Sequence, residues 1–255
     1  GAGFIGMEVA ASLTQRRMKV HVVAAGKVPM ARVFGEEIGQ WIADLHTGEG
    51  VELHMGHTAS EIIAGANGRA GGVTLDDGTR IEAGLVVAGL GIDPIVDYLE
   101  GTDLVEEGTV PVDDRLRTRA DGVFAAGDIA RAPTPPTGDP ARVEHWVVAE
   151  RQGRHVARVM LGEDEPYSVA PFFWTKQFHA PIQYVGHAEA WDRLVWREEL
   201  SDDGWLAGFY RGETLLAAAG FYRDDATIHV ARAMDAGRNI PPETFEDPDA
   251  DLARS

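Results

Sequence analysis

The sequence predicts an α/β fold in consecutive parts, and three observations support this prediction. A glycine pattern, Gly1-Ala2-Gly3-Phe4-Ile5-Gly6, opens the chain and is followed by a helical period. Short apolar strands and amphipathic helices then alternate, as in a parallel sheet covered by helices. Aromatic-rich segments between residues 172 and 222 indicate several further strands before a closing helix, which is typical of an α+β domain.

The opening glycines have the G-x-G-x-x-G spacing of a dinucleotide-binding fingerprint. In this motif the first glycine makes a tight turn, the second lets the backbone approach a pyrophosphate, and the third lets the helix pack closely. Gly1, Gly3 and Gly6 occupy these positions. The pattern alone is weak, because an ordinary strand-to-helix turn also fits it. A buried strand normally precedes the motif, and none precedes Gly1, so we expect the chain to be a fragment cut inside a domain.

The first part, residues 1–107, is predicted to be a Rossmann-type nucleotide-binding unit with a β-meander. In its first helix, Ile5, Val9 and Leu13 recur at helical spacing and are expected to form the apolar face. Asp76-Asp77-Gly78 is a strong hairpin turn. The predicted elements are a helix ending near residue 16, a strand at 19–24, a helix at 34–46, a strand at 51–55, the hairpin at 73–81 and a buried strand at 85–88.

Two further parts and a tail are predicted. Residues 108–165 form a second unit that begins with Pro111-Val112-Asp113 and should contain a buried strand at 122–128, a loop at 132–140 and a helix at 143–161. Residues 166–236 form the α+β domain, and residues 237–255 form an acidic tail that we expect to be disordered from residue 241. The α+β strands are predicted at 172–178, 182–186, 194–200, 206–210 and 215–222, with a helix at 226–236.

Composition excludes several classes of function. The chain has 255 residues and a net charge of −18, which argues against nucleic-acid binding because that binding needs a basic surface. No run of about 18 apolar residues exists, so no membrane span is predicted. Cysteine is absent, which removes disulfides and thiolate metal sites and fits a reducing, cytoplasmic location.

Three histidines are candidate metal ligands. His46, His54 and His57 lie close in sequence, near Glu49 and Glu52. Their spacing crosses a helix end, a turn and a strand, so they are not expected to converge, and no metal site is predicted.

Two later motifs strengthen the weak fingerprint. Residues 118–129, T-R-A-D-G-V-F-A-A-G-D-I, resemble the second flavin motif of two-dinucleotide flavoprotein reductases. Residues 171–177, P-F-F-W-T-K-Q, with 183–186, Q-Y-V-G, are similar to the C-terminal domain of ferredoxin and rubredoxin reductases, which apoptosis-inducing-factor-like oxidoreductases share. The chain thus resembles the FAD-dependent pyridine nucleotide-disulfide oxidoreductase superfamily, in its ferredoxin reductase and apoptosis-inducing-factor-like branch.

The resemblance implies an architecture and an activity. The family splits its FAD-binding domain and inserts the NAD(P)-binding domain, so residues 108–165 would be the C-terminal half of the FAD domain. The implied reaction passes a hydride from NADH or NADPH to FAD, then single electrons to a ferredoxin-, rubredoxin- or Rieske-type carrier. No general base or nucleophile is required, so no catalytic side chain is assigned. We expect the fragment alone to hold FAD poorly and to be inactive, and the protein to be a monomer or homodimer.

The resemblance also assigns the nicotinamide nucleotide to the opening helix. Gly1, Gly3, Ile5 and Gly6 would cradle it, Phe4 would lie against the rings as a gate, and Glu8 would accept a hydrogen bond from the carboxamide or a neighbouring residue. Gly91, with Gly89, would let backbone approach the nicotinamide edge. The alternatives are a core aromatic for Phe4, a solvated helix face for Glu8 and a simple strand-end turn at the later glycines.

FAD would be held by the later motifs. Asp128, beside Gly127, would accept the ribityl hydroxyls and Ile129 would offer its backbone amide, the alternative being a helix N-cap at Asp128. His145 and Trp146 would border the flavin ring, the alternative being buried aromatic residues at the start of a helix. Trp174 would close over the ring, the alternative being core packing of the C-terminal domain. The arginines flanking this segment are candidates for carrier docking: Arg131, Arg142, Arg151 and Arg154.

The choice of nicotinamide nucleotide is left open by the sequence, with a slight preference for NADH. The acid that binds the adenosine ribose in NAD enzymes is replaced by Gly26, and Lys27, with Arg32, is a candidate to face a 2′-phosphate.

Two other functions remain as alternatives. One is a nucleotide-responsive redox sensor of the apoptosis-inducing-factor type. The other is a disulfide or peroxide reductase whose cysteine lies outside this chain.

Overall fold

The computed structural model describes residues 1–254, which form two compact units. Unit 1 comprises Gly1–Gly91 and Thr175–Pro181, and unit 2 comprises Ile92–Trp174 and the chain from Ile182 onward. The chain thus leaves unit 2 within strand β9 (Phe172–Gln177) and returns to it within strand β10 (Ala180–Gly186). Among residues 1–254, no helix combines the length and the hydropathy that a bilayer span requires.

Unit 1 is built on two parallel strands, β1 (His21–Ala24) and β2 (Glu52–Met55). Helix α1 (Phe4–Gln15) contacts β1, and helix α2 (Ala31–Gly48) contacts β2, which confirms the predicted order of these elements. The long α2 bends at Gly35, whose φ of 80° interrupts the helical conformation.

The apolar face predicted for α1 was wrong. Ile5 is 64% exposed, whereas the buried side chains are Met7, Ala10 and Ala11. Small alanines let this helix approach the strands closely, so the packed face carries few of the large apolar residues on which the prediction was based.

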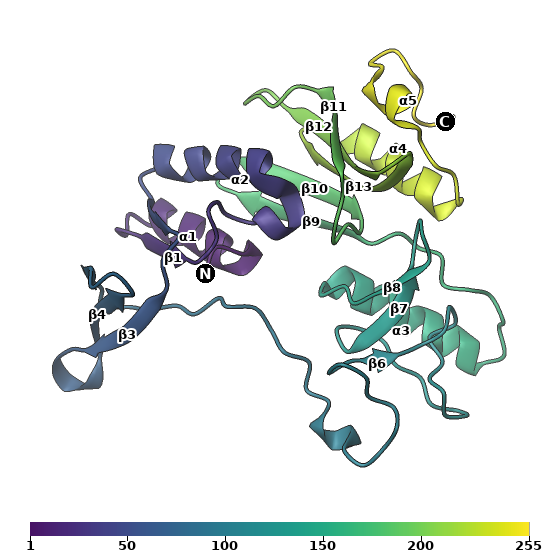
Figure 1. The fold of residues 1–255 in the computed structure, drawn as a ribbon, viewed down its shortest axis with the longest axis horizontal. Helices are drawn as coiled ribbons and strands as arrows, with labels where there is room; N and C mark the ends of the chain where they lie inside the picture. The colour runs from purple at the N-terminus through teal and green to yellow at the C-terminus, as the bar shows by residue number, and fades with distance from the viewer. Residues whose placement is uncertain (255) are drawn as a thin grey trace. The chain divides into compact units, whose positions relative to one another are not determined.

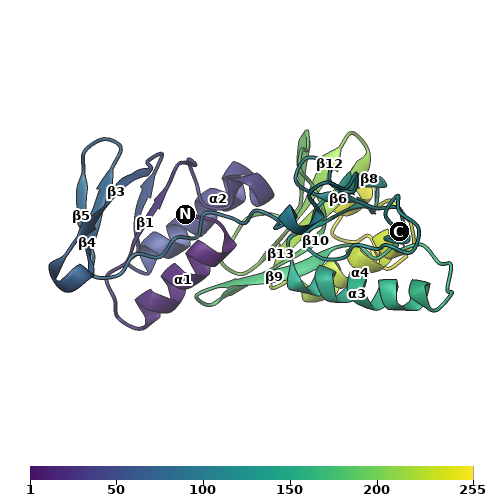
Figure 2. The ribbon, with the colours of Figure 1, turned by 90° about the horizontal axis from the view of Figure 1, so that it is seen from below.

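The meander of unit 1 contains the predicted hairpin around residues 76–78. Leu75 N donates to Thr79 O at 2.8 Å, which closes the turn. Figure 2 shows the three antiparallel strands together. They are β3 (Ala59–Ala64), β4 (Ala70–Leu75) and β5 (Arg80–Glu82), with a short 3₁₀ turn at Ala66–Gly68.

The buried strand predicted at residues 85–88 was wrong. This stretch belongs to no sheet, and Leu85 and Val87 are 56% and 48% exposed. An apolar run becomes a buried strand only between neighbouring strands, and none of the described strands pairs with this one.

Two predictions for the first part of unit 2 were also wrong. The predicted buried strand at 122–128 forms only an isolated bridge between Phe124 and Arg117. The predicted loop at 132–140 is instead largely an antiparallel hairpin, in which Pro133 and Pro140 are strand partners and residues 135–138 form the turn. The elements here are β6 (Val110–Pro111), β7 (Ala130–Thr134), β8 (Asp139–Ala141), the predicted helix α3 (Trp146–Met160) and a 3₁₀ turn at Asp97–Leu99.

The C-terminal sheet has all five predicted strands, in the order β11-β12-β13-β10-β9. Helix α4 (Asp224–Asp235), also predicted, packs against β13, and helix α5 (Pro242–Glu246) packs against β11 and β12 (Figure 1). The remaining strands are β11 (Arg193–Glu198), β12 (Trp205–Arg211) and β13 (Thr214–Phe221).

The disorder predicted from residue 241 was wrong for the described part of the tail. Phe245 and Leu252 are 0% and 4% exposed and belong to the core of the C-terminal sheet. Arg197 on β11 donates hydrogen bonds to the carbonyls of Phe245, Pro248 and Ala250. The acidic side chains that suggested disorder alternate with these anchors, so the apolar residues still bury enough surface to order the segment.

Candidate nucleotide and flavin site

The opening turn is a close contact of three glycines. A Cβ added at Gly1 would lie 2.1 Å from the carbonyl oxygen of Gly89, and a Cβ added at Gly6 would lie 2.0 Å from that of Gly1. A side chain at either position would therefore clash with backbone. A Cβ at Gly3, in contrast, would meet nothing within 4 Å. The first and third glycines of the motif therefore have no room for a side chain, whereas the middle glycine borders open space.

That space lies at the N-terminus of helix α1. Gly3 is the N-cap residue, and no side chain caps the helix or places an acid in its first turn. The first N–H groups of a helix have no partner within it, and together with the helix dipole they favour an anion. Phe4, beside them, packs edge-to-face on Phe34 with ring centroids 5.7 Å apart and is half-buried. This start of α1 suits a phosphate group close to the backbone.

Glu8, one turn further along α1, is held by the tip of the β9–β10 hairpin. The hydroxyl of Thr175 donates to Glu8 Oε1 at 2.5 Å. Gln177 Nε2 in turn donates to the Thr175 hydroxyl at 2.7 Å. Thr175 and Gln177 are 1% and 0% exposed, so water cannot replace these bonds. The carboxylate is therefore fixed in one orientation by a buried donor.

The same hydrogen-bond chain ends at His46 near the C-terminus of α2. His46 Nε2 lies 3.0 Å from Gln177 Oε1, and the imidazole packs edge-to-face on Phe178. Burial lowers the pKa of His46, and the bond to Gln177 opposes that shift only in part. A neutral imidazole can donate from Nε2 to the amide oxygen, which orients the Gln177 amide so that its nitrogen faces Thr175.

Sequence reasoning missed Thr175, Gln177 and His46 as parts of this site. The first two lie in the P-F-F-W-T-K-Q segment, from which only Trp174 was selected. Side chains alternate along a strand, so Thr175 and Gln177 share a face opposite to that of Trp174. That alternation was the available signal, whereas nothing local in the sequence connects His46 to this strand.

In unit 2, the Gly-Asp step is anchored to helix α3. Gly127 has a φ of 79°, a left-handed conformation that favours glycine, and its N–H donates to Gln152 Oε1 at 2.7 Å. Asp128 is half-buried, and its carbonyl accepts a bond from Arg142 at 3.5 Å. The carbonyl of Ile129 accepts from Val110 N at 2.8 Å, which fixes this residue against β6. These contacts hold the backbone rigidly and leave the Asp128 carboxylate outside them.

The three aromatic residues predicted to surround the flavin ring lie together in unit 2. Trp146 and Trp174 meet edge-to-face with ring centroids 5.7 Å apart, and His145 lies 6.3 Å from Trp174. Phe173 lies against His145 with ring centroids 5.2 Å apart and the two rings tilted by 31°. His145 also caps α3, because its Nδ1 accepts a hydrogen bond from Val147 N. The two tryptophans stay 61% and 47% exposed, so the cluster presents an open aromatic surface.

Other predicted residues have ordinary partners. Lys27 Nζ forms an exposed ion pair with Glu36 at 3.3 Å. Gly91 has a φ of 98° and open space around it. Three of the four candidate docking arginines are already paired with carboxylates: Arg131 with Glu107, Arg142 with Glu144 and Arg154 with Glu150. Arg131, Arg142 and Arg154 therefore do not form a set of unpaired cations that could bind an acidic carrier.

The sequence matches two family models, the pyridine nucleotide-disulphide oxidoreductase family over residues 1–153 and the reductase C-terminal domain over residues 172–255. Human apoptosis-inducing factor 3 is 32% identical over 96% of this chain, which spans 41% of that protein. The ferredoxin–NAD(+) reductase component of the anthranilate 1,2-dioxygenase system of Burkholderia cepacia is 30% identical over 99% of the chain, which spans 62% of it.

A solved structure has the same fold along the whole chain. The ferredoxin reductase of the CYP199A2 system of Rhodopseudomonas palustris superposes with a TM-score of 0.91 and 32% identity, over 100% of this chain and 63% of that one. The chain therefore belongs to the pyridine nucleotide-disulphide oxidoreductase family.

Proposed function

We propose that this chain is the nicotinamide-binding and C-terminal part of a flavoprotein reductase that passes electrons from NADH, through FAD, to a ferredoxin-type carrier. The observation that carries this proposal is the opening turn, where Gly1 and Gly6 are closed by backbone while Gly3 borders open space at an uncapped helix N-terminus. The names of the ferredoxin reductases that the chain resembles supply the acceptor class. The proposal also includes rubredoxin- and Rieske-type carriers as alternative electron acceptors.

The residues present fit a nicotinamide dinucleotide in unit 1. The N–H groups at the start of α1 would take the pyrophosphate above Gly3, with Gly1, Ile5 and Gly6 forming the turn around it. Phe4 would border the nicotinamide as an aromatic wall. Glu8 would accept from the carboxamide, and its orientation would come from Thr175 rather than from solvent. Gly91, with no side chain, would leave room at the nicotinamide edge.

The residues of unit 2 fit part of an FAD site. The Asp128 carboxylate would accept ribityl hydroxyls, while the anchored backbone at Gly127 and Ile129 would keep it in place. His145, Trp146 and Trp174 would border the ring and exclude water from it. When bound, FAD supplies the conversion of a two-electron hydride into single electrons, and the protein supplies alignment and exclusion of solvent.

We infer a preference for NADH over NADPH. A 2′-phosphate needs an available cation, and the charge of Lys27 is offset by Glu36. The two charges are strongly exposed, so this pairing is weak by itself and acts mainly by placing an acid beside the lysine. The relative from Burkholderia cepacia is named for NAD(+), in agreement with this preference. Removing Glu36 as Glu36→Gln should therefore improve binding of NADPH more than that of NADH.

Nucleotide binding by the chain tests the first half of the proposal. Calorimetric titration with NADH should give one site per chain. Gly3→Ala should raise its Kd by about tenfold or more, because the methyl group enters the space left for the phosphate. Gly48→Ala is a matched control, since that glycine ends α2 and also has open space around it. Absence of NADH binding, or equal Kd values for both variants, would contradict this site.

Electron transfer tests the second half and requires the complete flavin-loaded protein. Steady-state reduction of a [2Fe–2S] ferredoxin with NADH should show rapid turnover. A long-lived nicotinamide complex without reduction of the carrier would instead favour the nucleotide-responsive sensor.

A further inference from the structure

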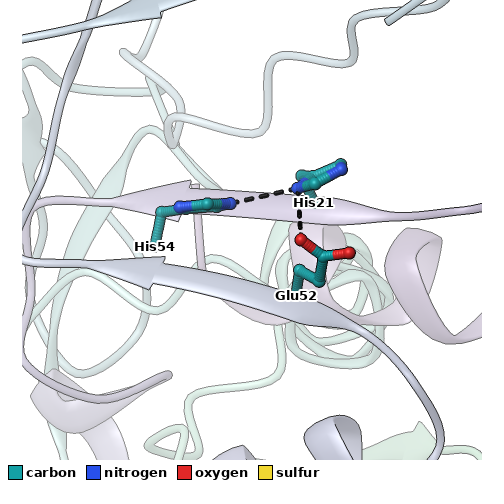
Figure 3. Close-up of side chains that lie close together, drawn as sticks. All are labelled: His21, Glu52 and His54. Carbon is teal, nitrogen blue, oxygen red and sulfur yellow. Dashed lines mark hydrogen bonds and ion pairs between the residues drawn. The ribbon is translucent and has the colours of Figure 1, made fainter. Parts of the chain in front are cut away.

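Two histidines and a glutamate converge on one face of the β1–β2 pair, away from the residues assigned above. His21 and Glu52 are direct partners in the parallel register, and His54 lies two residues beyond Glu52 on the same face. Figure 3 shows the three side chains turned toward one another. Sequence reasoning considered His54 with His46 and His57, but the structure gives those two other partners, Gln177 and Asp76. His21 was missed because it lies far from His54 in sequence.

The spacing of the three groups matches a metal centre. His21 Nδ1 lies 3.0 Å from His54 Nε2 and 3.4 Å from Glu52 Oε2. The three ligand atoms all lie within 4.8 Å of one another. Two nitrogen ligands of a tetrahedral Zn²⁺ ion, each about 2.0–2.1 Å from the metal, are separated by about 3.3 Å. A metal ion can therefore be reached by all three atoms with small side-chain adjustments.

His21 Nδ1 is shared between two neighbours, an imidazole nitrogen and a carboxylate oxygen. His21 Nδ1 faces both His54 Nε2 and Glu52 Oε2, and a neutral imidazole has at most one proton on that nitrogen. It can therefore donate to only one of the two neighbours at a time, and all three ligand atoms lie around the same point. A divalent cation at that point would accept all three lone pairs at once.

Glu52 is oriented for this role by Lys19. Lys19 Nζ contacts Glu52 Oε1 at 3.0 Å, while Oε2 faces the histidines. The carboxylate can thus offer one oxygen to a metal while its other oxygen is held by a neighbour, a common outer-shell arrangement. The side chains of His21 and Glu52 are 16% and 50% exposed, so the point of convergence is accessible to an ion and to a water molecule as a fourth ligand.

A second His–acid cluster in unit 1 shows the contrast. His57, Asp76 and Asp77 are also close together, but their carboxylates already accept hydrogen bonds from two threonines of the meander. Asp76 accepts from the backbone and hydroxyl of Thr58, and Asp77 accepts from the Thr79 N–H. That cluster has one imidazole and a structural task, whereas the β1–β2 trio has two imidazoles directed at one point.

We propose that His21, Glu52 and His54 bind one divalent transition-metal ion of the zinc type, with water completing a tetrahedron. Two imidazoles and one carboxylate suit Zn²⁺ and Co²⁺ and disfavour Mg²⁺ and Ca²⁺, which prefer oxygen ligands. None of the three residues belongs to the nucleotide or flavin site, so this inference is independent of the proposed function.

The test is titration of the metal-free full chain with Zn²⁺ by calorimetry, and with Co²⁺ by visible absorption. One ion should bind per chain, and Co²⁺ should give the intense absorption of a tetrahedral site. His21→Ala and His54→Ala should each weaken binding by about tenfold or more, since even outer-shell partners contribute about 10–100-fold. Glu52→Gln changes little in shape and should weaken binding as well, which protects the test if a histidine variant unfolds.

His57→Ala is the matched control, because it removes a histidine from the neighbouring cluster and should leave the Zn²⁺ affinity unchanged. The proposal is overturned if wild-type chain binds no ion at a one-to-one ratio. Equal affinities in the wild type, His21→Ala and His54→Ala would overturn it too, since binding would then lie elsewhere. A Co²⁺ spectrum of octahedral type would also contradict the three-ligand tetrahedral site.

Discussion

Replacing Thr175 with valine removes one hydroxyl from the middle of the chain of bonds between Glu8 and His46. Valine keeps the size and the β-branching of threonine, so strand β9 should keep its backbone conformation. The change leaves Glu8 Oε1 without its 2.5 Å donor and Gln177 Nε2 without its 2.7 Å acceptor. The perturbation is therefore confined to two hydrogen bonds in a buried place.

The magnitude follows from these two bonds. A hydrogen bond to a charged group contributes about 1.5–3 kcal/mol, and leaving a buried polar group unsatisfied costs about 1–3 kcal/mol. Glu8 is half-buried and can regain some solvation, whereas Gln177 is 0% exposed and cannot. We expect the free energy of unfolding to fall by about 3 kcal/mol. This figure combines part of the loss at Glu8, which water can partly replace, with the full cost of the unsatisfied Gln177 amide.

Urea unfolding followed by circular dichroism measures this change, with the slope m expected to stay constant. Thr214→Val is the matched control, because Thr214 begins β13 and its hydroxyl makes no hydrogen bond within the described residues. If Thr175→Val costs no more than Thr214→Val, the hydroxyl does not hold Glu8, and the orientation argued for this carboxylate is wrong.

Three further predictions concern other parts of the chain. Gly6→Ala should destabilise by about 1–3 kcal/mol or more because its Cβ would meet the Gly1 carbonyl, while Gly3→Ala should change the thermal midpoint little; equal melting curves would contradict the closed turn. Burial lowers the pKa of His46 below its ordinary 6.5, so the unfolded chain binds a proton that the folded chain does not. The free energy of unfolding should thus be highest above about pH 6.5 and fall below that pH. Urea unfolding at several pH values should show a weaker pH dependence for His46→Gln than for the wild type, and an equal pH dependence would contradict the buried neutral imidazole. Phe245→Ala should cost about 3–5 kcal/mol in urea unfolding, whereas a disordered tail predicts almost no cost.

The elements that the sequence predicted correctly are those whose hydrophobic pattern agrees with their burial in the structure. Strands β9 to β13 were found because aromatic and β-branched residues cluster there between turn residues. The first parallel strands and helices followed from the glycine fingerprint and helical spacing. In each of these cases, the neighbouring strands and helices that bury the element lie within residues 1–254.

The failures have a different origin. The apolar runs at 85–88 and 122–128 indicate burial, but burial also needs neighbouring strands, which no local pattern reports. The acidic composition of the tail predicts disorder, but Phe245 and Leu252 are buried in a core and Arg197 holds the backbone between them. The contacts of His46 with Gln177 and of His21 with His54 join residues distant in sequence, so only the folded structure brings them together.

The number of residues in strand β9 ahead of Trp174 and Thr175 cannot change without altering where these two side chains point. Trp174 and Thr175 point to opposite sides of this strand, and Trp174 contacts Trp146 while Thr175 donates to Glu8. Because the side-chain period of a strand is two, deleting or inserting a single residue ahead of them would exchange their sides. Both groups would then be misdirected by one event, so gaps in this strand should be selected against more strongly than most substitutions within it.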